Sequence, residues 1–485
     1  MEQIVVLILP NIAWSKKNKS VDWTIWPISL CTFAAVLEPE YNVKIIDANI
    51  DNLSEEALTQ RIQTLQPLAV GISVFCDDYA DGGHTAARIV KSINTEVPVV
   101  MGGSYVTLNP DVATKDDNID YFVVGEGEFV FKAILDYLSG STETLPDCGV
   151  IYRTADGLLV DCSNRHAIEC LDQLPFPEYG KIDFFKYATK EERNSAFKPP
   201  ILPYGRITTS RGCPFSCCFC QVEAINGAGI RYRSVANVLN EVEMLIKRYQ
   251  IKSLLVDDAN FTANQKRAKA IIRGFIERQF TLQWRIQSLA AYTLDTELLE
   301  LMLASGCNHV DLAIESGSQR VLSEIIRKPL NLNRVVSLLD TAKALGFMIS
   351  ANFIIGLPGE TWEEIRQTIR FAEAIDVDYV KIMVAMPLRH TKLYEIAHDG
   401  GYLRKDFDFF NMRWGVGEIS TEEFTNLDTT ILRTYEWDRI NFSSAEKILR
   451  VARVMGVDEE TIVKMRVSTR KSLEQLLSAG NVLRR

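Results

Sequence analysis

Arg211-Gly212-Cys213-Pro214-Phe215-Ser216-Cys217-Cys218-Phe219-Cys220 contains four of the ten cysteines of this chain. Within it, Cys213, Cys217 and Cys220 have CxxxCxxC spacing. Three thiolates on one short loop suit three corners of a cubane iron–sulfur cluster, and the fourth iron then stays open for a small molecule. A zinc site more often recruits a fourth cysteine or a histidine, and Cys218 directly adjoins Cys217, so one loop would not easily aim both at one metal. The spacing therefore predicts a [4Fe–4S] cluster ahead of zinc or a structural coincidence.

The cysteine loop stands near the start of an alternating series of strands and helices between residues 201 and 400. Apolar, β-branched runs mark the strands and amphipathic segments mark the helices. The expected strands are Ile207–Thr209, Ser253–Val256, Leu282–Gln287, His309–Ile314, Met348–Ile355 and Tyr379–Met383. The expected helices are Ser234–Tyr249, Asn264–Arg278, Asp295–Ala304, Gln319–Ile326, Leu332–Leu345 and Thr361–Ile375. Such a series predicts a partial (β/α)6 TIM-type barrel with its active site at the carboxyl ends of the strands.

Residues 1–140 alternate in the same way and predict a doubly wound, Rossmann-like α/β domain. Ligands bind such sheets beyond the carboxyl ends of the strands, where glycines either let the backbone approach a ligand or merely turn the chain. No GxGxxG follows the first strand, which disfavours an ordinary dinucleotide fold. Residues 141–200 are rich in proline and predict a linker, with a possible hairpin around Asp156-Gly157. Residues 401–485 predict a small, mostly helical C-terminal region.

The aromatic Phe219 before the last cysteine, on a loop after the first barrel strand, resembles the radical S-adenosylmethionine (radical SAM) superfamily. The wider run Ser210–Pro214 resembles the subgroup whose barrel follows a cobalamin-binding domain. Other segments keep the order and spacing of that subgroup, and the resemblance covers roughly residues 1–400. These segments are Met101–Pro110, Val124–Glu128, Arg231–Ser234, Val256–Thr262, Gly306-Cys307, Leu312–Gly317 and Phe353–Thr361.

The resemblance implies that S-adenosylmethionine (SAM) binds the open iron and is cleaved reductively to a 5′-deoxyadenosyl radical. It also implies a set of SAM-binding residues at the carboxyl ends of the strands. These are Phe219, Asp257, Asp258, Arg285, Gln287, Glu315, Gly356 and Leu357. Each of these assignments has an alternative. Asp257 and Asp258 could instead cap the following helix, and Glu315 could instead be an ion-pair partner.

The resemblance further implies a cobalamin site on the loops of the N-terminal domain. The residues expected there are Ser73, Cys76, Asp77, Gly102, Gly103, Ser104, Tyr105, Gly125, Glu126 and Gly127. The first loop, Asn11 to Asp22, has no histidine, and His84 falls inside an expected helix, so we expect cobalamin without a histidine ligand. The chain departs from its relatives at Trp14–Lys19, Trp23–Pro27 and Leu388–Thr391, which marks either a specialised or a degenerate pocket.

The leading functional hypothesis is a cobalamin-dependent radical methyltransferase that acts on an unactivated carbon of a small molecule or natural-product intermediate. The alternative is a radical enzyme of the same lineage with non-methylating chemistry, such as cyclisation, ring contraction, dehydration or epimerisation. A cobalamin- or cluster-based sensor is a weaker third hypothesis. A methylthio-transferring enzyme is disfavoured, because Cys31 and Cys76 do not supply a second three-cysteine set. The expected partners are a small-molecule substrate and a reductant such as flavodoxin or ferredoxin.

The composition of the chain limits its expected location and the classes of partner that it could bind. The 485 residues carry 53 Lys and Arg against 63 Asp and Glu, a net charge of −10, which argues against a broad nucleic-acid-binding surface. The longest apolar runs fall short of the roughly 18 residues that a membrane span needs, and no basic signal segment precedes Ile4–Leu9. Ten cysteines in a chain of this size do not suggest a secreted disulfide scaffold. We therefore expect a cytoplasmic protein with neither a membrane span nor a nucleic-acid partner.

Overall fold

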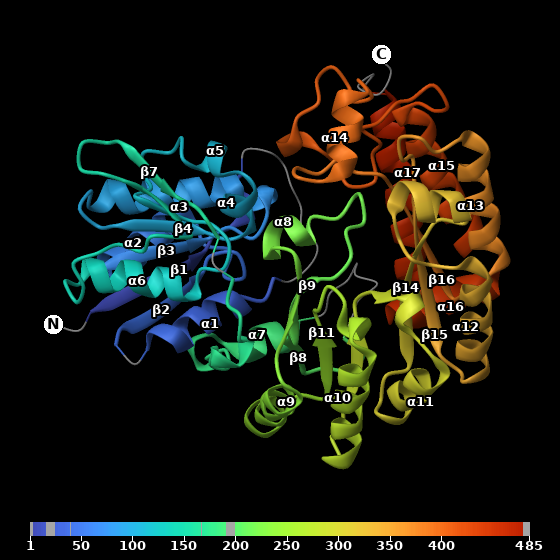
Figure 1. Ribbon diagram of the computed structural model, residues 1–485, viewed down its shortest axis with the longest axis horizontal. Coiled ribbons are helices and arrows are strands. Elements are labelled where there is room, and N and C mark those ends of the chain that lie inside the picture. The colour runs from blue at the N-terminus through green and yellow to red at the C-terminus, as the bar shows by residue number, and fades with distance from the viewer. Residues whose placement is uncertain (1–2, 16–24, 39, 166, 191–198, 479–485) are drawn as a thin grey trace. The chain divides into compact units, whose positions relative to one another are not determined.

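The computed structural model describes residues 3–15, 25–38, 40–165, 167–190 and 199–478 (Figure 1). The chain forms two compact units. The first consists of Met1–Lys190 with Ile225–Gly227, and the second consists of Glu191–Ala224 with Ala228–Arg485. No helix among the described residues combines the length and apolar character that crossing a bilayer requires.

The N-terminal unit is built on a seven-stranded sheet in the order β2-β1-β3-β4-β5-β6-β7. The first five strands are parallel: β1 (Ile4–Leu9), β2 (Asn42–Asp47), β3 (Ala69–Ser73), β4 (Val99–Gly102) and β5 (Tyr121–Val123). The connecting helices are α1 (Ile28–Leu37), α2 (Glu55–Leu65), α3 (Ala80–Ile93), α4 (Ser104–Leu108), α5 (Pro110–Ala113) and α6 (Glu128–Leu138). The apolar side chains of β1 are buried in the core between sheet and helices, as the continuous run predicted. The doubly wound fold class is thereby confirmed.

The sheet extends further along the chain than the sequence predicted. β6 (Val150–Arg153) and β7 (Leu159–Cys162) form the expected hairpin, but β6 also pairs antiparallel with β5. The following segment, with α7 (Phe184–Ala188), packs its rings around Trp26. Residues 141–190 are therefore part of the N-terminal unit and not a separate linker, because the hairpin supplies hydrogen bonds to the otherwise open edge of β5.

The second unit contains the expected barrel strands in two parallel ladders. One ladder has the order β12-β11-β8, with β8 (Tyr204–Ile207), β11 (Ser253–Val256) and β12 (Gln283–Ile286). The other contains β13 (Leu289–Ala290), β14 (His309–Glu315), β15 (Met348–Ile355) and β16 (Tyr379–Val384) in sequence order. Helices α9 (Val235–Tyr249), α10 (Gln265–Glu277), α11 (Thr296–Ala304), α12 (Leu332–Ala344) and α13 (Trp362–Ala374) alternate with the strands. The partial barrel is confirmed, although no ladder pairing between β12 and β14 is present in the described chain.

Three local features differ from the predictions for this unit. The first strand ends at Ile207, where the expected strand began. A second pair of strands, β9 (Ser210–Cys213) and β10 (Gly229–Tyr232), runs antiparallel and frames the cysteine loop. The expected helix at 319–326 is a π-helix over Val321–Ile326.

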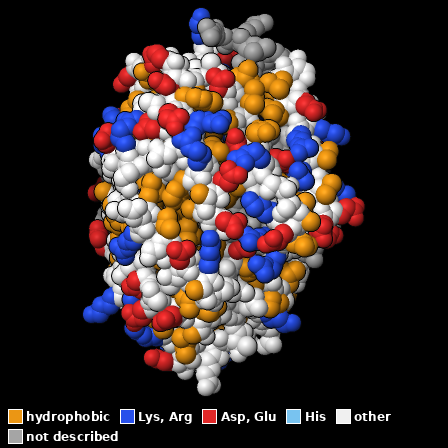
Figure 2. Space-filling model, turned by 90° about the vertical axis from the view of Figure 1, so that its right-hand side faces the viewer, with side chains coloured by type: hydrophobic (Ala, Val, Ile, Leu, Met, Phe, Trp, Pro, Cys, Tyr) orange, Lys and Arg blue, Asp and Glu red, His pale blue; other side chains and the backbone are white. Residues whose placement is uncertain are grey.

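The C-terminal region is helical, as predicted. It contains α14 (Lys392–Asp399), α15 (Asn426–Asn441), α16 (Ala445–Met455) and α17 (Glu459–Ser478). α15 packs against β16 and α13, and its side chains Arg433 and Asn441 hydrogen-bond to the backbone of β16, so α15 covers the edge of the second ladder. Basic and acidic side chains are interspersed over the face shown in Figure 2.

Candidate radical SAM and cobalamin sites

The strand that leads into the cysteine loop is held by the buried carboxylate of Asp258. Asp258 accepts hydrogen bonds from the backbone and hydroxyl of Thr209, both at 2.5 Å, and from the hydroxyl of Ser210 at 2.6 Å. Burial raises the pKa of Asp258, and these hydrogen bonds oppose the rise. Arg267 of α10 donates to the Thr209 carbonyl at 2.7 Å and lies over the Tyr232 ring. The entry to the loop is thus fixed from two neighbouring elements.

Gly212 is required by the close pairing of β9 with β10. Its φ of +88° is unfavourable for residues with a side chain. A Cβ at this position would also lie less than 3.0 Å from the carbonyl oxygen of Gly229 on the opposite strand. The glycine before Cys213 therefore lets the two strands approach and sets where the loop begins.

Asp257 also has a partner inside the barrel. It forms a two-pronged ion pair with Arg206 of β8, with both N–O distances at 2.8 Å. Both aspartates that the resemblance assigned to SAM thus make internal contacts. Their place after β11 is as predicted, and their contact with SAM stays a prediction. Neither side chain accepts the N-cap hydrogen bond of α10, which Asn264 provides.

The cysteine loop is tied to two helical segments through Cys218. Its backbone N–H donates to the carbonyl of Ile326 at 3.2 Å, and its carbonyl accepts from the N–H of Leu393 at 2.8 Å. Cys218 is buried, and burial raises the pKa of its thiol to about 12. A tight turn with a 3.0 Å hydrogen bond from the Cys220 N–H to the Cys217 carbonyl follows. Cys218 is therefore an anchoring residue of the loop.

Cys213, Cys217 and Cys220 lie close enough to one another to interact electrostatically. Burial raises the pKa of Cys217 to about 11; Lys328 opposes the rise, and Glu315, Cys220 and Cys213 add to it. Burial also raises the pKa of Cys220. No three His, Cys, Asp or Glu side chains of the described residues converge on a single metal ion. A cubane cluster does not need that convergence, because each cysteine binds a different iron. The donor set and its spacing fit such a cluster.

Two side chains that the sequence did not reveal border the cysteines. The side-chain amide of Asn260 donates to the sulfur of Cys213 at 3.7 Å. The Tyr292 ring packs edge-on against Phe215 with 5.0 Å between centroids, and its pKa is raised by burial and then by Cys217 and Cys213. Asn260 follows β11 and Tyr292 follows β13, so the carboxyl ends of these strands face the loop. Asn260 falls within the segment Val256–Thr262 that resembles the subgroup, whereas no pattern in the sequence marks Tyr292.

Glu315 ends β14 and is paired with a buried lysine. Nζ of Lys328 lies 2.8 Å from a Glu315 carboxylate oxygen. Glu315 has a φ of +76°, and the pairing of β14 with β15 shifts register between Ala313 and Glu315. The ion-pair alternative for Glu315 is therefore present, and its contact with SAM stays a prediction.

The Gly356–Glu360 turn closes the end of β15. The buried carboxylate of Glu360 accepts from the backbone N–H groups of Gly356 at 2.8 Å and Leu357 at 3.1 Å. Burial raises the pKa of Glu360 to about 8. Leu357 is fully buried, and the hydrogen bond to Glu360 fixes the backbone of Gly356. The contact of these two residues with SAM stays a prediction.

The two predicted residues of β12 differ in their surroundings. Arg285 is buried and donates to the carbonyl of Val454 in α16 at 3.3 Å, and burial lowers its pKa. Its charge also acts on His309 and Cys307 near the start of β14. Arg285 therefore lies near the amino end of β14. Gln287 follows β12 directly and is half-buried.

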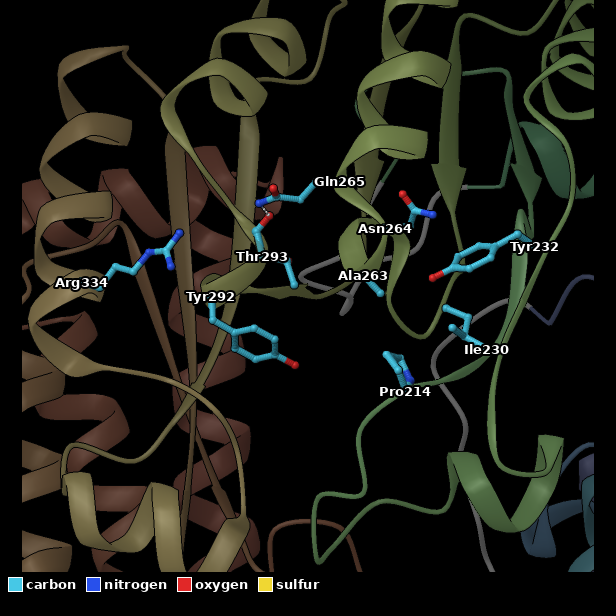
Figure 3. Close-up of a pocket in the computed structure, with 9 residues that line it drawn as sticks. All are labelled: Pro214, Ile230, Tyr232, Ala263, Asn264, Gln265, Tyr292, Thr293 and Arg334. Carbon is cyan, nitrogen blue, oxygen red and sulfur yellow. Dashed lines mark hydrogen bonds between the residues drawn. The ribbon is translucent and has the colours of Figure 1, made fainter.

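A cavity of about 630 Å³ adjoins the cysteine loop (Figure 3). Tyr232 and Tyr292 project into it from opposite sides, and Arg334 is its one charged lining residue. Gln265 is held by a 2.6 Å hydrogen bond to the Thr293 carbonyl. The lining residues are Pro214, Ile230, Tyr232, Ala263, Asn264, Gln265, Tyr292, Thr293 and Arg334. The volume lies in the range of small-molecule sites.

In the N-terminal unit, the predicted cobalamin residues lie at the carboxyl ends of β3, β4 and β5. Gly103 has a φ of +105°, and a Cβ there would clash with the carbonyl of Val74, so this glycine serves close packing of the chain. Asp77 accepts from Asn109 at 2.9 Å, and Glu126 accepts from Ile168 at 2.6 Å. Phe75 is 53% exposed. Ser73, Cys76, Gly102, Ser104 and Gly125 are partly exposed, whereas Tyr105 and Gly127 are buried.

This edge of the sheet exposes one aromatic ring and part of the backbone. The exposed ring of Phe75 offers an apolar contact to a ligand, and the partly exposed backbone of Gly102 offers polar groups. His84 of α3 is engaged at both ring nitrogens, with Asp116 at 2.6 Å and with the Tyr105 hydroxyl at 2.9 Å. The unusual sequence at Trp14–Lys19 and Trp23–Pro27 falls mainly on residues 16–24, which lie outside the described residues.

Comparison with known proteins matches both units. The family model of the radical SAM superfamily matches residues 207–372, and that of the B12 binding domain matches residues 20–135. An uncharacterized methyltransferase of Pyrococcus horikoshii is 34% identical over 394 residues, which are 81% of this chain and 83% of that protein. The chain therefore belongs to the radical SAM superfamily, in the family of cobalamin-dependent members that includes methyltransferases. It is an enzyme.

Other relatives show the range of the family. The cytidylyl-2-hydroxyethylphosphonate methyltransferase of Streptomyces wedmorensis is 29% identical, with 81% of this chain and 82% of that protein covered. The anaerobic magnesium-protoporphyrin IX monomethyl ester cyclase of Rubrivivax gelatinosus is 27% identical, with 74% and 63% covered. The fold also matches the structure of the radical SAM methyltransferase TsrM of Kitasatospora setae, with cobalamin and a [4Fe–4S] cluster bound. That match has a TM-score of 0.67 at 21% identity and covers 83% of this chain and 79% of TsrM.

Proposed function

We propose that this enzyme transfers a methyl group to an unactivated carbon of a small molecule. The observation that carries the proposal is the three-cysteine loop on a radical SAM barrel, in one chain with a B12 binding domain. When bound, a [4Fe–4S] cluster supplies the electron that splits SAM into methionine and a 5′-deoxyadenosyl radical, and methylcobalamin supplies the methyl group. The chain itself has to bind, orient and shield these groups.

The described contacts divide these tasks among the residues. Cys213, Cys217 and Cys220 hold the cluster, and Asp258 keeps the approach to Cys213 in place. Phe219, Glu315 and Gln287 contact SAM at the carboxyl ends of the strands. The backbone of Gly356 and Leu357, fixed by Glu360, packs on the adenine. Asp257 and Arg285 do not contact SAM directly, because their side chains already bind other groups of the barrel unit. They hold the neighbouring strands in place.

Cobalamin binds without a histidine ligand to cobalt. His84 is the sole histidine of residues 1–140, and both of its ring nitrogens have partners. The Co(II) form should therefore show an EPR spectrum without nitrogen superhyperfine coupling, and His84→Gln should leave that spectrum unchanged. Nitrogen coupling that disappears in His84→Gln would contradict the assignment.

The cavity beside Tyr232 and Tyr292 supports a small-molecule substrate. Its volume suits a molecule of metabolite size, and Arg334 offers one positive charge to an anionic group. A low-potential electron carrier such as flavodoxin or ferredoxin supplies the electron for SAM cleavage.

The test is anaerobic reconstitution with iron, sulfide and hydroxocobalamin, followed by optical spectra and assay of 5′-deoxyadenosine. Cys217→Ala should lose both the cluster absorbance and the cleavage of SAM. Cys218→Ala is the matched control, because Cys218 anchors the loop through its backbone and should keep both. Cleavage of SAM by Cys217→Ala would refute the cluster assignment.

Non-methylating radical chemistry is the second candidate. It is favoured by the similarity to a cyclase, which differs in reaction from the methyltransferases. Product mass separates the two functions, since methylation adds one CH2 to the substrate. SAM cleavage that yields a product without this increase would support the second candidate.

A further inference from the structure

Lys328 is a buried cation next to the carboxyl end of β14. Its side chain is 5% exposed, and that of its partner Glu315 is 8% exposed. Nζ of Lys328 donates to the Ala313 carbonyl at 2.7 Å and to Glu315 at 2.8 Å. Burying an ammonium group is costly unless it is paired and hydrogen-bonded, so the two contacts fix where this charge resides.

The π-helix Val321–Ile326 contacts the cysteine loop at its last residue and leads directly to Lys328. The helix ends at Ile326, and Arg327 follows with a φ of +63°. The N–H of Lys328 then donates to the Leu322 carbonyl at 2.8 Å, while the Ile326 carbonyl accepts from Cys218. Short π-helical segments are uncommon and are often found at functional sites. A shift of this turn would move the lysine and the cysteine loop together.

Glu315 needs an external restraint to keep its conformation. A residue with a side chain at positive φ is strained, and it keeps this conformation only where its surroundings impose it. Lys328 bridges the Ala313 carbonyl and the Glu315 carboxylate, which lie on either side of the register shift in β14. The lysine therefore clamps the distorted end of the strand.

The same charge lies next to the cysteine loop. Lys328 follows Ile326 by two residues, and the Ile326 carbonyl accepts a hydrogen bond from the N–H of Cys218, which directly adjoins Cys217. Reduction of a cluster held by the thiolates of this loop adds one negative charge close to the buried side chains of Lys328 and Glu315. A nearby buried cation stabilises the reduced form, and a nearby anion destabilises it.

We propose that Lys328 is the positioning residue that holds Glu315 at the end of β14 and supplies the buried positive charge that favours the reduced cluster. This inference rests on the proposed cluster at Cys213, Cys217 and Cys220. The reductive step is balanced by one electron from the external carrier to the cluster, which oxidises the carrier by one electron. Lys328 changes the equilibrium of that step and does not itself gain or lose an electron.

The test is a redox titration of the reconstituted full-length protein, followed by EPR of the reduced cluster. At the potential that half-reduces the wild-type cluster, Lys328→Met should lower the ratio of reduced to oxidised cluster about tenfold, or about 59 mV for one electron. Glu315→Gln should raise the ratio, because it removes the opposing charge. Lys328→Arg should stay within about twofold of wild type. Lys343→Met is the matched control, because Lys343 also donates to a carbonyl, at 2.7 Å from Ile375, but on α12.

The outcomes separate the two proposals. Opposite shifts for Lys328→Met and Glu315→Gln, with Lys343→Met unchanged, support the assignment of Lys328. Full cluster content with an unshifted midpoint in Lys328→Met refutes it and leaves the proposed function intact. If Lys328→Met fails to assemble a cluster, Glu315→Gln decides alone, and an unshifted or lowered midpoint refutes the assignment. A wild-type protein that forms no cluster refutes the proposed function itself.

Discussion

Substitution of Gly212 by alanine should loosen the entry to the cysteine loop without touching a cysteine. At a φ of +88°, an alanine costs about 1–2 kcal/mol. The new Cβ would also crowd the Gly229 carbonyl and lie 3.5 Å from the Ile230 Cα, which forces β9 and β10 apart at this pair. Loss of one ladder hydrogen bond adds about 1 kcal/mol, for a total of about 2–3 kcal/mol.

Gly229→Ala is a matched control on the opposite strand. Its φ is +82°, so the conformational cost is similar, but a Cβ there would meet no atom within 4 Å. The difference between the two variants therefore isolates the steric contact that brings β9 and β10 together.

Hydrogen–deuterium exchange by mass spectrometry measures this local stability. A loss of about 2–3 kcal/mol should lower the protection of the Arg211–Cys213 amides roughly thirty- to a hundredfold in Gly212→Ala, against about tenfold in Gly229→Ala. Iron content after reconstitution should fall in Gly212→Ala and be largely kept in Gly229→Ala. Equal protection and equal iron content in the two variants would refute the reasoning.

Three further predictions concern the surroundings of the loop. Arg334→Ala should raise the KM for the substrate about tenfold and change kcat little, because it removes the charged group that lines the cavity; an unchanged KM would exclude this cavity as the substrate site. Glu360→Gln should flatten the pH dependence of stability in urea unfolding, since the burial-raised pKa of about 8 makes the wild type lose stability as pH rises from about 4.5 to about 8. A wild-type stability that rises over this interval would contradict the burial argument. Tyr292→Phe should keep cluster content because the ring still packs on Phe215, whereas Tyr292→Ala should lose cluster content, as measured by iron analysis; equal content in both variants would show that the ring is not needed.

Local sequence patterns predicted most of the strands and the cysteine loop. Continuous apolar runs such as Ile4–Leu9 need no partner in the sequence to be recognised as buried strands. Helix starts also have a local signal, because N-cap side chains such as Ser54 and Thr361 accept hydrogen bonds from the first turns of α2 and α13.

The remaining features depend on contacts between residues far apart in the chain. The pairing of β9 with β10 places Arg211 opposite Arg231, and two charged residues give no strand signal. α15 was not predicted because it buries polar residues such as Thr430, Thr434 and Asn441, which interrupt any apolar stripe. Lys328 and Tyr292 reach the cysteines only through the barrel, so no local spacing identifies them.

The hairpin β6–β7 determines where a fragment that contains only the N-terminal unit should end. A fragment that ended at residue 140 would leave the backbone of Tyr121–Val123 bare along one side and would lose the strand that covers it. A bare strand of this kind invites pairing with another chain and thus aggregation. A fragment that ends at Lys190 keeps the hairpin and the hydrogen bond from Glu178 to the Cys31 carbonyl. Studies of cobalamin binding by the isolated half should therefore use this longer boundary.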